Sequence, residues 1–290
     1  FNNITTNGIY YIGNSNKEPG RPIYARYSNL TLNDCTFESN SHVEFSSKSN
    51  VIIDDCTFTS NSANYGGAIY ADSNSNLTVT GSKFTLNEGS FSGGAISASN
   101  LKVSDSEFTL NSAAWGGAVY MGYGTSILNI TDSVFDSNNA NMYRNIYASS
   151  QVEYDLQFNE YDLNLQLIAK DGAYGMEYVL EGVFDWGSNL DNNYTVLAGI
   201  RDDENLFEKL VSIKDNQFNI SMGVLSAGTH EFAMEGMFIQ GDSNDHYYTR
   251  SYYSDLYGNE FYLNKGEYAK ILIEKANITL TLDVKSVLIP

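Results

Sequence analysis

A repeat in the first half of the chain constrains its fold more than any other feature. Five phenylalanines, at spacings of 21, 26, 24 and 27 residues, are each followed three residues later by an asparagine. A Cys or Ser lies two residues before each phenylalanine. Repeats of this length are typical of solenoids, in which each coil packs only on its neighbours. The marker residues are Phe37, Asn40, Phe58, Asn61, Phe84, Asn87, Phe108, Asn111, Phe135 and Asn138.

The spacing within one repeat predicts its first two strands. Val51 and Ile53 lie on one face of a strand, and Cys56 and Phe58 share one face of the next, because side chains alternate along a strand. The two pairs differ in parity, so the chain must bend between them. Asp55 stands at that bend and is a common turn residue.

A third apolar strand, Ile-Tyr-Ala or a close variant, closes each coil. In three repeats a Gly-Gly pair precedes it, which indicates a corner that needs positive φ or a close approach of neighbouring coils. We therefore expect three strands and three bends per coil, that is, a triangular parallel β-helix. The third strands are expected at 23–25, 43–45, 69–71, 96–98, 119–121 and 146–148, and the glycine pairs are Gly66, Gly67, Gly93, Gly94, Gly116 and Gly117.

Stacked coils about 4.8 Å apart would align equivalent side chains in ladders. We expect the aliphatic, Cys or Ser, and Phe positions to point inward. The asparagines should form an amide ladder in which each side chain bonds the next coil and satisfies buried backbone groups at the corner.

The pattern Phe58-Thr-Ser-Asn61 followed by Gly66-Gly-Ala-Ile69 resembles the paired repeat of the chlamydial polymorphic outer-membrane proteins and of the adhesin-like surface proteins of methanogens. The methanogen type is the closer match, and the resemblance covers about residues 23–150. It implies a right-handed parallel β-helix displayed outside the cell, with adhesion as its role.

From residue 151 the coil pattern gives way to short alternating runs separated by turn residues, which favour a β-sandwich. The stretch Leu225–Phe232 resembles a strand entry of Ig-like surface domains, and one helical turn is expected within 202–210. We predict an all-β chain, with a right-handed parallel β-helix of about six coils at 1–150, an Ig-like β-sandwich at 151–275, and the start of a following domain or a linker at 276–290.

Composition excludes some partners. Asp and Glu outnumber Lys and Arg by 35 to 16, and the net charge of −19 argues against nucleic acid and anionic membrane surfaces. The sequence has no run of about 18 apolar residues, so we expect no membrane insertion in this segment. Because the sequence begins at Phe1, we expect a monomeric segment of a larger surface protein. Seven Asn-x-Ser/Thr sequons permit surface glycosylation, at Asn3, Asn29, Asn76, Asn129, Asn193, Asn219 and Asn277.

The residues that carry chemistry in other proteins are sparse here. Cys35 and Cys56 occupy the same slot in neighbouring coils, and we expect buried, reduced thiols, because parallel side chains hold the sulfur atoms badly for a disulfide. The histidines are scattered and predict neither a metal site nor catalysis; they are His42, His230 and His246. We expect no cofactor.

Aspartates line up at one bend, and paired carboxylates serve glycoside hydrolysis. They are Asp54, Asp55, Asp105 and Asp132. Turn chemistry explains them, and basic residues that would bind acidic sugars are nearly absent from the coils, so a carbohydrate-active β-helix enzyme is kept only as an alternative. Calcium at these bends would lack a recognisable ligand spacing.

The third strands predict the candidate ligand face. Their inward residues are aliphatic, so the residue between them must face outward, in a row of mostly tyrosines. Exposed aromatic rows stack on sugar rings or anchor protein contacts, although tyrosine also simply favours strands. The candidate contact residues are Tyr24, Tyr65, Tyr70, Trp115, Tyr120 and Tyr147, with Glu44, Ser97 and Phe91 on the same side.

These observations favour a non-enzymatic, extracellular, adhesin-like protein at a cell surface or cell wall. Its expected partners are glycans or proteins on host or neighbouring cells, bound weakly at many repeats. The alternatives are the carbohydrate-active enzyme, a polysaccharide lyase or glycoside hydrolase, and a structural stalk that binds nothing.

Overall fold

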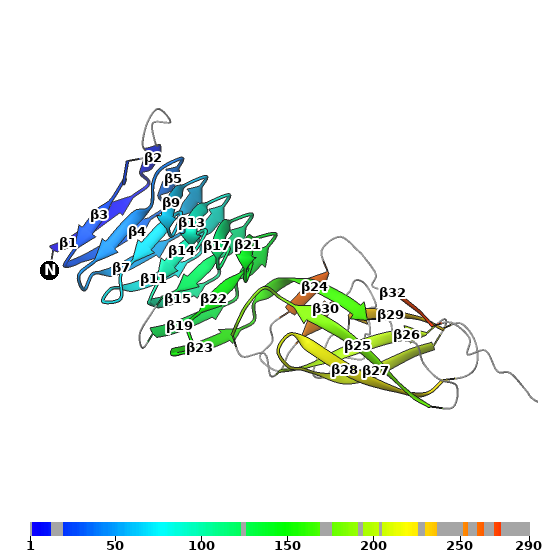
Figure 1. Ribbon diagram of the computed structural model, residues 1–290. Coiled ribbons are helices and arrows are strands. Elements are labelled where there is room, and N and C mark those ends of the chain that lie inside the picture. Colours follow the sequence, from blue (N-terminus) through cyan, green and yellow to red (C-terminus); the bar gives the residue numbers. More distant parts are fainter. Residues whose placement is uncertain are drawn as a thin grey trace, which may run out of the picture.

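The computed structural model describes residues 2–12, 20–122, 126–168, 176–190, 194–202, 205–225, 230–236, 252–254, 260–263 and 270–273. Every regular element in these residues is a β-strand. The first part is a parallel β-helix whose coils stack in chain order (Figure 1).

Three parallel sheets form the sides of the β-helix. Sheet A holds β1 (Asn2–Asn7), β4 (Ser28–Asn33), β7 (Asn50–Asp54), β11 (Asn76–Thr80), β15 (Asn100–Ser104), β19 (Ser126–Thr131) and β23 (Val152–Gln157). Sheet B holds β2 (Tyr10–Ile12), β5 (Thr36–Glu38), β8 (Thr57–Thr59), β12 (Lys83–Thr85), β16 (Glu107–Thr109), β20 (Val134–Asp136) and β24 (Glu160–Ile168). Sheet C holds β3 (Tyr24–Arg26), β6 (Val43–Ser46), β10 (Ile69–Ala71), β14 (Ile96–Ala98), β18 (Val119–Met121) and β22 (Ile146–Ala148).

The expectation of three strands per coil is wrong for the third to sixth coils, because a fourth strand precedes the corner before sheet C there. These strands form sheet D, with β9 (Ser62–Tyr65), β13 (Glu88–Ser92), β17 (Ser112–Trp115) and β21 (Asn139–Met142). The second coil runs from Asn40 to β6 with only Ser41 and His42 between, so it has no room for this strand. Within the described residues, which leave out 13–19, each of the first two coils has three strands.

The predicted inward ladders are confirmed. The aliphatic, Cys or Ser, and Phe positions of the second to sixth coils are all buried. The phenylalanine rings stack in parallel, with centroids 4.7–4.9 Å apart from Phe37 to Phe135. Tyr161 continues the stack at 5.2 Å, and Trp186 covers Tyr161 at 4.5 Å. This column of rings runs through the core of the β-helix, beside the buried aliphatic residues.

The predicted amide ladder is also present. Asn87 Nδ2 donates to Asn111 Oδ1 and to the Phe58 carbonyl oxygen, both at 3.0 Å. Its Oδ1 accepts from the backbone N–H and from Nδ2 of Asn61, at 3.0 and 2.9 Å. The same bonds recur in the neighbouring coils, so each buried amide satisfies groups of the coils on either side.

Positive φ angles mark the bends, as the turn residues predict. The bend between sheets A and B has φ near 50° at Asp55, and Gly81 takes the same place in the next coil. At the corner before sheet C, Gly66, Gly93 and Gly116 have φ of 57°, 64° and 61°. The second glycine of each pair is needed for space, because a Cβ on Gly94 would overlap the Gly117 carbonyl oxygen of the next coil.

The stack continues beyond the predicted domain boundary at 150. β23 pairs in parallel with β19, and the start of β24 pairs with β20. Asn159 takes the place of the Ser position, since its Oδ1 accepts the N–H of Ser133 at 3.0 Å. The boundary therefore falls inside the parallel stack, and the long strand β24 belongs to both parts of the chain.

The second part contains antiparallel strands. β24 pairs with β25 (Glu177–Asp185), which pairs with β28 (Gln217–Val224). β31 (Glu260–Leu263) lies beside β24 and pairs with β30 (Tyr252–Ser254). A separate sheet has the order β27 (Asn205–Ile213), β26 (Tyr194–Asp202), β29 (His230–Gly236) and β32 (Lys270–Ile273).

The helical turn expected within 202–210 is wrong, because β27 occupies most of that range as a strand paired with β26. Pairing with β26 makes this segment a strand and outweighs the helical preference of its residues. The Ig-like character of the second part stays a prediction. Residues 226–229 of the predicted strand entry and all of 276–290 lie outside the described residues, and residues 230–232 of that entry begin β29.

After the β-helix the chain comes back and covers β22, the last strand of sheet C. After β25, residues 186–190 lie against β22, where the Gly187 carbonyl oxygen accepts the N–H groups of Asn145 and Ile146 at 2.8 and 3.1 Å. The side-chain amide of Asn189 bonds both the N–H and the carbonyl oxygen of Ala148, at 2.8 and 2.6 Å. We call residues 186–190 the cap.

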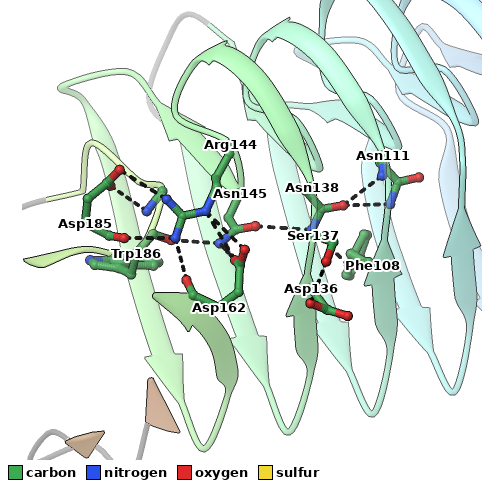
Figure 2. Close-up of polar contacts among 11 residues, drawn as sticks. Phe108, Asn111, Asp136, Ser137, Asn138, Arg144, Asn145, Asp162, Asp185 and Trp186 are labelled. Carbon is green, nitrogen blue, oxygen red and sulfur yellow. Dashed lines mark hydrogen bonds and ion pairs between the residues drawn. The ribbon is translucent and has the colours of Figure 1, made fainter. Parts of the chain in front are cut away.

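Polar contacts fasten the cap to the end of the β-helix (Figure 2). Asn145 Oδ1 accepts from Asn138 Nδ2 at 3.1 Å and so ends the amide ladder, while its own Nδ2 donates to Asp162 and to the Trp186 carbonyl oxygen. The Arg144 guanidinium bonds the carboxylates of Asp162 and Asp185, at 3.3 and 3.1 Å, and both of their carbonyl oxygens. Arg144 takes the place of the second corner glycine and Asn145 that of the alanine after it, so the sequence departs from the repeat where the cap binds.

The two cysteines are free and buried, as expected. The N–H of Cys35 donates to Cys56 Sγ at 3.3 Å, and Cys56 Sγ lies 3.2 Å from the Asp54 carbonyl oxygen. In the next coils Ser82 and Ser106 make the same two contacts with their hydroxyls. The thiols therefore act as members of a serine-type ladder.

Burial raises the pKa of the Cys56 thiol from 9.0 to about 11. The unfolded chain then loses this proton at lower pH than the folded chain, so the stability contribution is intact below pH 9 and falls as pH rises towards 11. We expect about 2 kcal/mol of unfolding free energy to be lost over this range. Urea denaturation at pH 8 and pH 11 would measure it.

The Cys56→Ser variant is the control for that experiment. Serine fills this slot in three later coils, so the variant should fold and should lose less stability between pH 8 and pH 11 than the unchanged protein. An equal loss in both proteins would contradict the assignment to Cys56. Under denaturing, non-reducing conditions two thiols should titrate; fewer would contradict the free-thiol state.

Candidate functional site

Sheet D carries a ridge of large, exposed side chains. Tyr65, Trp115 and Met142 follow one another through the register of the sheet, with Ser92 in the fourth coil. A register shift between Gly89 and Ser92 turns Ser92 inward and Phe91 outward. The four large side chains are 41–55% exposed, and we call Tyr65, Phe91, Trp115 and Met142 the ridge.

The predicted outward row lies on the adjacent sheet C. Tyr24 is well exposed, and Tyr70, Tyr120 and Tyr147 are half-buried. Ser97 is a correction: it stands in register between Tyr70 and Tyr120 but is only 5% exposed. Its short side chain lies between two tyrosines of the flanking coils, which shield it.

Ring contacts join the ridge to this row in two clusters. In the first, the Tyr65 ring is 5.6 Å from Phe91 and 6.4 Å from Tyr70. In the second, the Tyr147 ring lies 5.0 Å from Tyr120 in a stacked arrangement and 5.3 Å from Trp115 edge to face. Tyr143 adds a contact with Tyr147 at 5.6 Å. The clusters are thus displayed on the third and fourth coils and on the fifth and sixth.

The sequence did not single out Tyr143 and Met142 as contact residues. Tyr143 takes the positive-φ place of the first corner glycine, with φ of 61°, and so presents a ring at that corner. Met142 became recognisable only with sheet D, because β9, β17 and β21 have no buried positions that could reveal a strand. If a fourth strand had been expected, the alignment of Met142 with Trp115 in neighbouring coils could have identified Met142 as a contact residue.

Three interacting polar side chains, Arg21, His42 and Glu44, lie beside the first cluster. Glu44 Oε2 lies 2.7 Å from an Arg21 nitrogen and 3.4 Å from His42 Nε2. The His42 ring is 5.8 Å from Tyr70. Burial lowers the pKa of His42 although Glu44 opposes this, and burial together with Asp72 and Glu44 raises the pKa of Tyr70. Both side chains are therefore neutral at pH 7, and His42 is buried beneath the surface that Tyr70 lines.

The aspartates at the sheet A–B bend do not form a constellation of their own. Asp55, Asp105 and Asp132 are exposed and have φ of 49–51°, which aspartate tolerates better than most residues. Among the described residues, no three His, Cys, Asp or Glu side chains are grouped so that they could hold a metal ion. His230 begins β29, and His246 lies outside the described residues.

Comparisons with known proteins identify the first part of the chain. A family model described as the right-handed beta helix region matches residues 1–159. No curated protein and no solved structure matches. The match agrees with the parallel stack, which extends to the same point, and gives the predicted handedness. In the described part of the chain no helix is long and apolar enough to cross a membrane.

Proposed function

This chain belongs to the right-handed β-helix family, and on that premise we propose that it is an extracellular, adhesin-like surface protein that binds glycans or proteins of neighbouring or host cells. The proposal includes a non-enzymatic role, a cell-surface or cell-wall location and an Ig-like second part that follows the β-helix. The family contains both adhesins and carbohydrate-active enzymes, so the choice depends on the candidate site.

The observation that supports binding is the pair of aromatic clusters. Aromatic rings at a surface offer flat apolar area for the faces of sugar rings and for protein anchors. Folding does not require the ridge, because its side chains are about half exposed and add little to the core. Large exposed aromatics without a packing role are a common sign of a contact surface.

The repeat supports weak binding at several places. The two clusters lie on the same side of the β-helix, about two coils or 10 Å apart. A repetitive glycan or a clustered protein surface can engage both at once, and avidity then multiplies two weak contacts. The acidic chain disfavours acidic partners, so neutral glycans and neutral or basic protein surfaces suit it best.

Substitution of one tyrosine from each cluster tests the proposal. We expect the Tyr70→Ser/Tyr120→Ser double variant to bind glycan arrays or cells at least about tenfold more weakly, because each ring supplies about 1 kcal/mol of contact. Tyr10→Ser removes an aromatic on sheet B that is 73% exposed, more than Tyr70 or Tyr120, and that lies away from both clusters, so this variant should bind normally. Thermal unfolding of each variant would show that the fold is retained.

Unchanged binding by the double variant would remove this face as the ligand site. If the unchanged protein binds no glycan, protein surface or cell, the structural stalk becomes the better interpretation. Release of reducing ends or unsaturated products from polysaccharides would instead support the carbohydrate-active enzyme.

A further inference from the structure

Three sequons of sheet A share one arrangement. In Asn29-Leu30-Thr31, Asn76-Leu77-Thr78 and Asn129-Ile130-Thr131 the middle residue is buried in the core. Strand alternation then places the asparagine and the threonine together on the outer face. All three asparagines are partly or fully exposed. The amide and the hydroxyl that define an acceptor therefore lie side by side on one accessible surface.

The outer face already holds asparagine side chains in a ladder. Asn76 Nδ2 donates to Asn50 Oδ1 at 2.9 Å, and Asn50 Nδ2 donates to Asn29 Oδ1 at 3.0 Å. An amide nitrogen carries two hydrogens, and one of them suffices for each ladder bond. A sugar can thus replace the second hydrogen of Asn76 without removing the bond to Asn50.

From the second to the sixth coil, coils with an acceptor alternate with coils that lack one; the first coil carries a further sequon at Asn3, in register with Asn29. Asn29, Asn76 and Asn129 belong to the second, fourth and sixth coils. The third and fifth coils keep the ladder asparagines, Asn50 and Asn100, but carry Ile52 and Lys102 where the hydroxyl would be. Asn29 and Asn76 share one row two coils apart, about 9.6 Å, and Asn129 lies two residues further along the strand, about 12 Å from Asn76. Glycans in one row on adjacent coils, as on Asn3 and Asn29, would be crowded at about 4.8 Å.

We propose that the outer face of sheet A is an N-glycosylation face with Asn29, Asn76 and Asn129 as acceptors. The donor is an oligosaccharide linked through its first sugar to a lipid phosphate or pyrophosphate, and a cellular transferase catalyses the reaction. The asparagine Nδ2 forms a bond to C1 of that sugar as the C1–O bond to phosphate breaks. The phosphate leaves with the bonding electrons, and the amide gives up one proton to solvent.

This face and the aromatic clusters are on different sides of each coil, since the clusters lie on sheets C and D (Figure 1). Glycans on sheet A would cover a polar side and leave the ridge open. The inference shares with the proposed function the need for export from the cell, but it makes no use of ligand binding.

The test is to secrete the chain from a host that N-glycosylates and to map the modified asparagines by peptide mass spectrometry. We expect sugars on at least two of Asn29, Asn76 and Asn129, and none on Asn50 or Asn100. Thr78→Val should abolish the modification of Asn76 alone. Sugar on fewer than two of the three acceptors would overturn the proposal, whatever the binding assays of the tyrosine variants show.

The Ile52→Thr variant tests the spacing. It creates a sequon at Asn50, between two acceptors, and Ile52 is exposed, so the fold should tolerate the change. We expect molecules with sugar on Asn50 to lack it on Asn29 and Asn76. Intact-mass and peptide analysis that finds all three modified in the same folded molecule would overturn the alternate-coil arrangement.

Discussion

Replacement of Gly94 by alanine is expected to destabilise the β-helix by about 3 kcal/mol or more. A Cβ at this position would lie 2.5 Å from the Ser112 nitrogen and 2.7 Å from the Ser112 oxygen, and would overlap the Gly117 carbonyl oxygen. All three are backbone atoms of the next coil, so no side chain can move aside. Because each coil is stabilised only by its neighbours, separation of two central coils weakens the whole stack.

Gly122→Ala is the matched control. A Cβ there meets nothing closer than 3.8 Å, and φ is not positive, so the unfolding free energy should change by less than about 0.5 kcal/mol. Urea denaturation of both variants, followed by circular dichroism, makes the comparison. Equal stability of Gly94→Ala and the unchanged protein would show that neighbouring coils do not approach as closely at this corner as the structure indicates.

The core of the β-helix was predictable because the sequence repeat determines which residues point inward. Coils stacked at one spacing must place equivalent residues in line, so the Phe84 ring and the Asn87 amide had to meet the same residue types in adjacent coils. Positive φ at Asp55 and Gly66 follows from the same reasoning, since those residue types favour that conformation.

Sheet D was missed because three of its four strands bury no residue. Strand prediction depends on alternation of apolar and polar residues, and β9 and β21 show mainly exposed or half-exposed positions. The same lack of burial makes this sheet the natural place for contact residues. The proposed ligand face was therefore predicted from its tyrosines on sheet C, while its more exposed half on sheet D was only partly predicted.

The end of the stack was misplaced because two marker residues are replaced there. Asn159 and Tyr161 follow the spacing of Ser133 and Phe135 but differ from them in residue type. The start of a seventh coil was therefore not predicted. The cap is a different case. Trp186–Leu190 has the composition of an ordinary turn, and only tertiary contacts about 40 residues away along the chain, such as Asn145 to Gly187, give it a role.

The second large effect is expected at the cap, where Arg144→Met should lower the opening free energy by about 3 kcal/mol. The side chains of Arg144 and Asp162 are only 18% and 10% exposed. Removal of the guanidinium leaves the Asp162 carboxylate buried without its cation, and the carbonyl oxygens of Asp162 and Asp185 lose a donor. Lys83→Met breaks an ion pair whose partners are 58% and 52% exposed, and should cost under about 1 kcal/mol.

Hydrogen exchange at the amides of Asn145 and Ile146 measures this opening, because both donate to the Gly187 carbonyl oxygen. Their exchange should be about 100-fold faster in Arg144→Met. Addition of Asp162→Asn removes the uncompensated charge and still leaves an oxygen that can accept from Asn145 Nδ2, so the double variant should recover part of the protection. If exchange in Arg144→Met matches that in Lys83→Met, backbone pairing alone holds the cap. The β-helix would then end without any contribution from the Arg144 cluster.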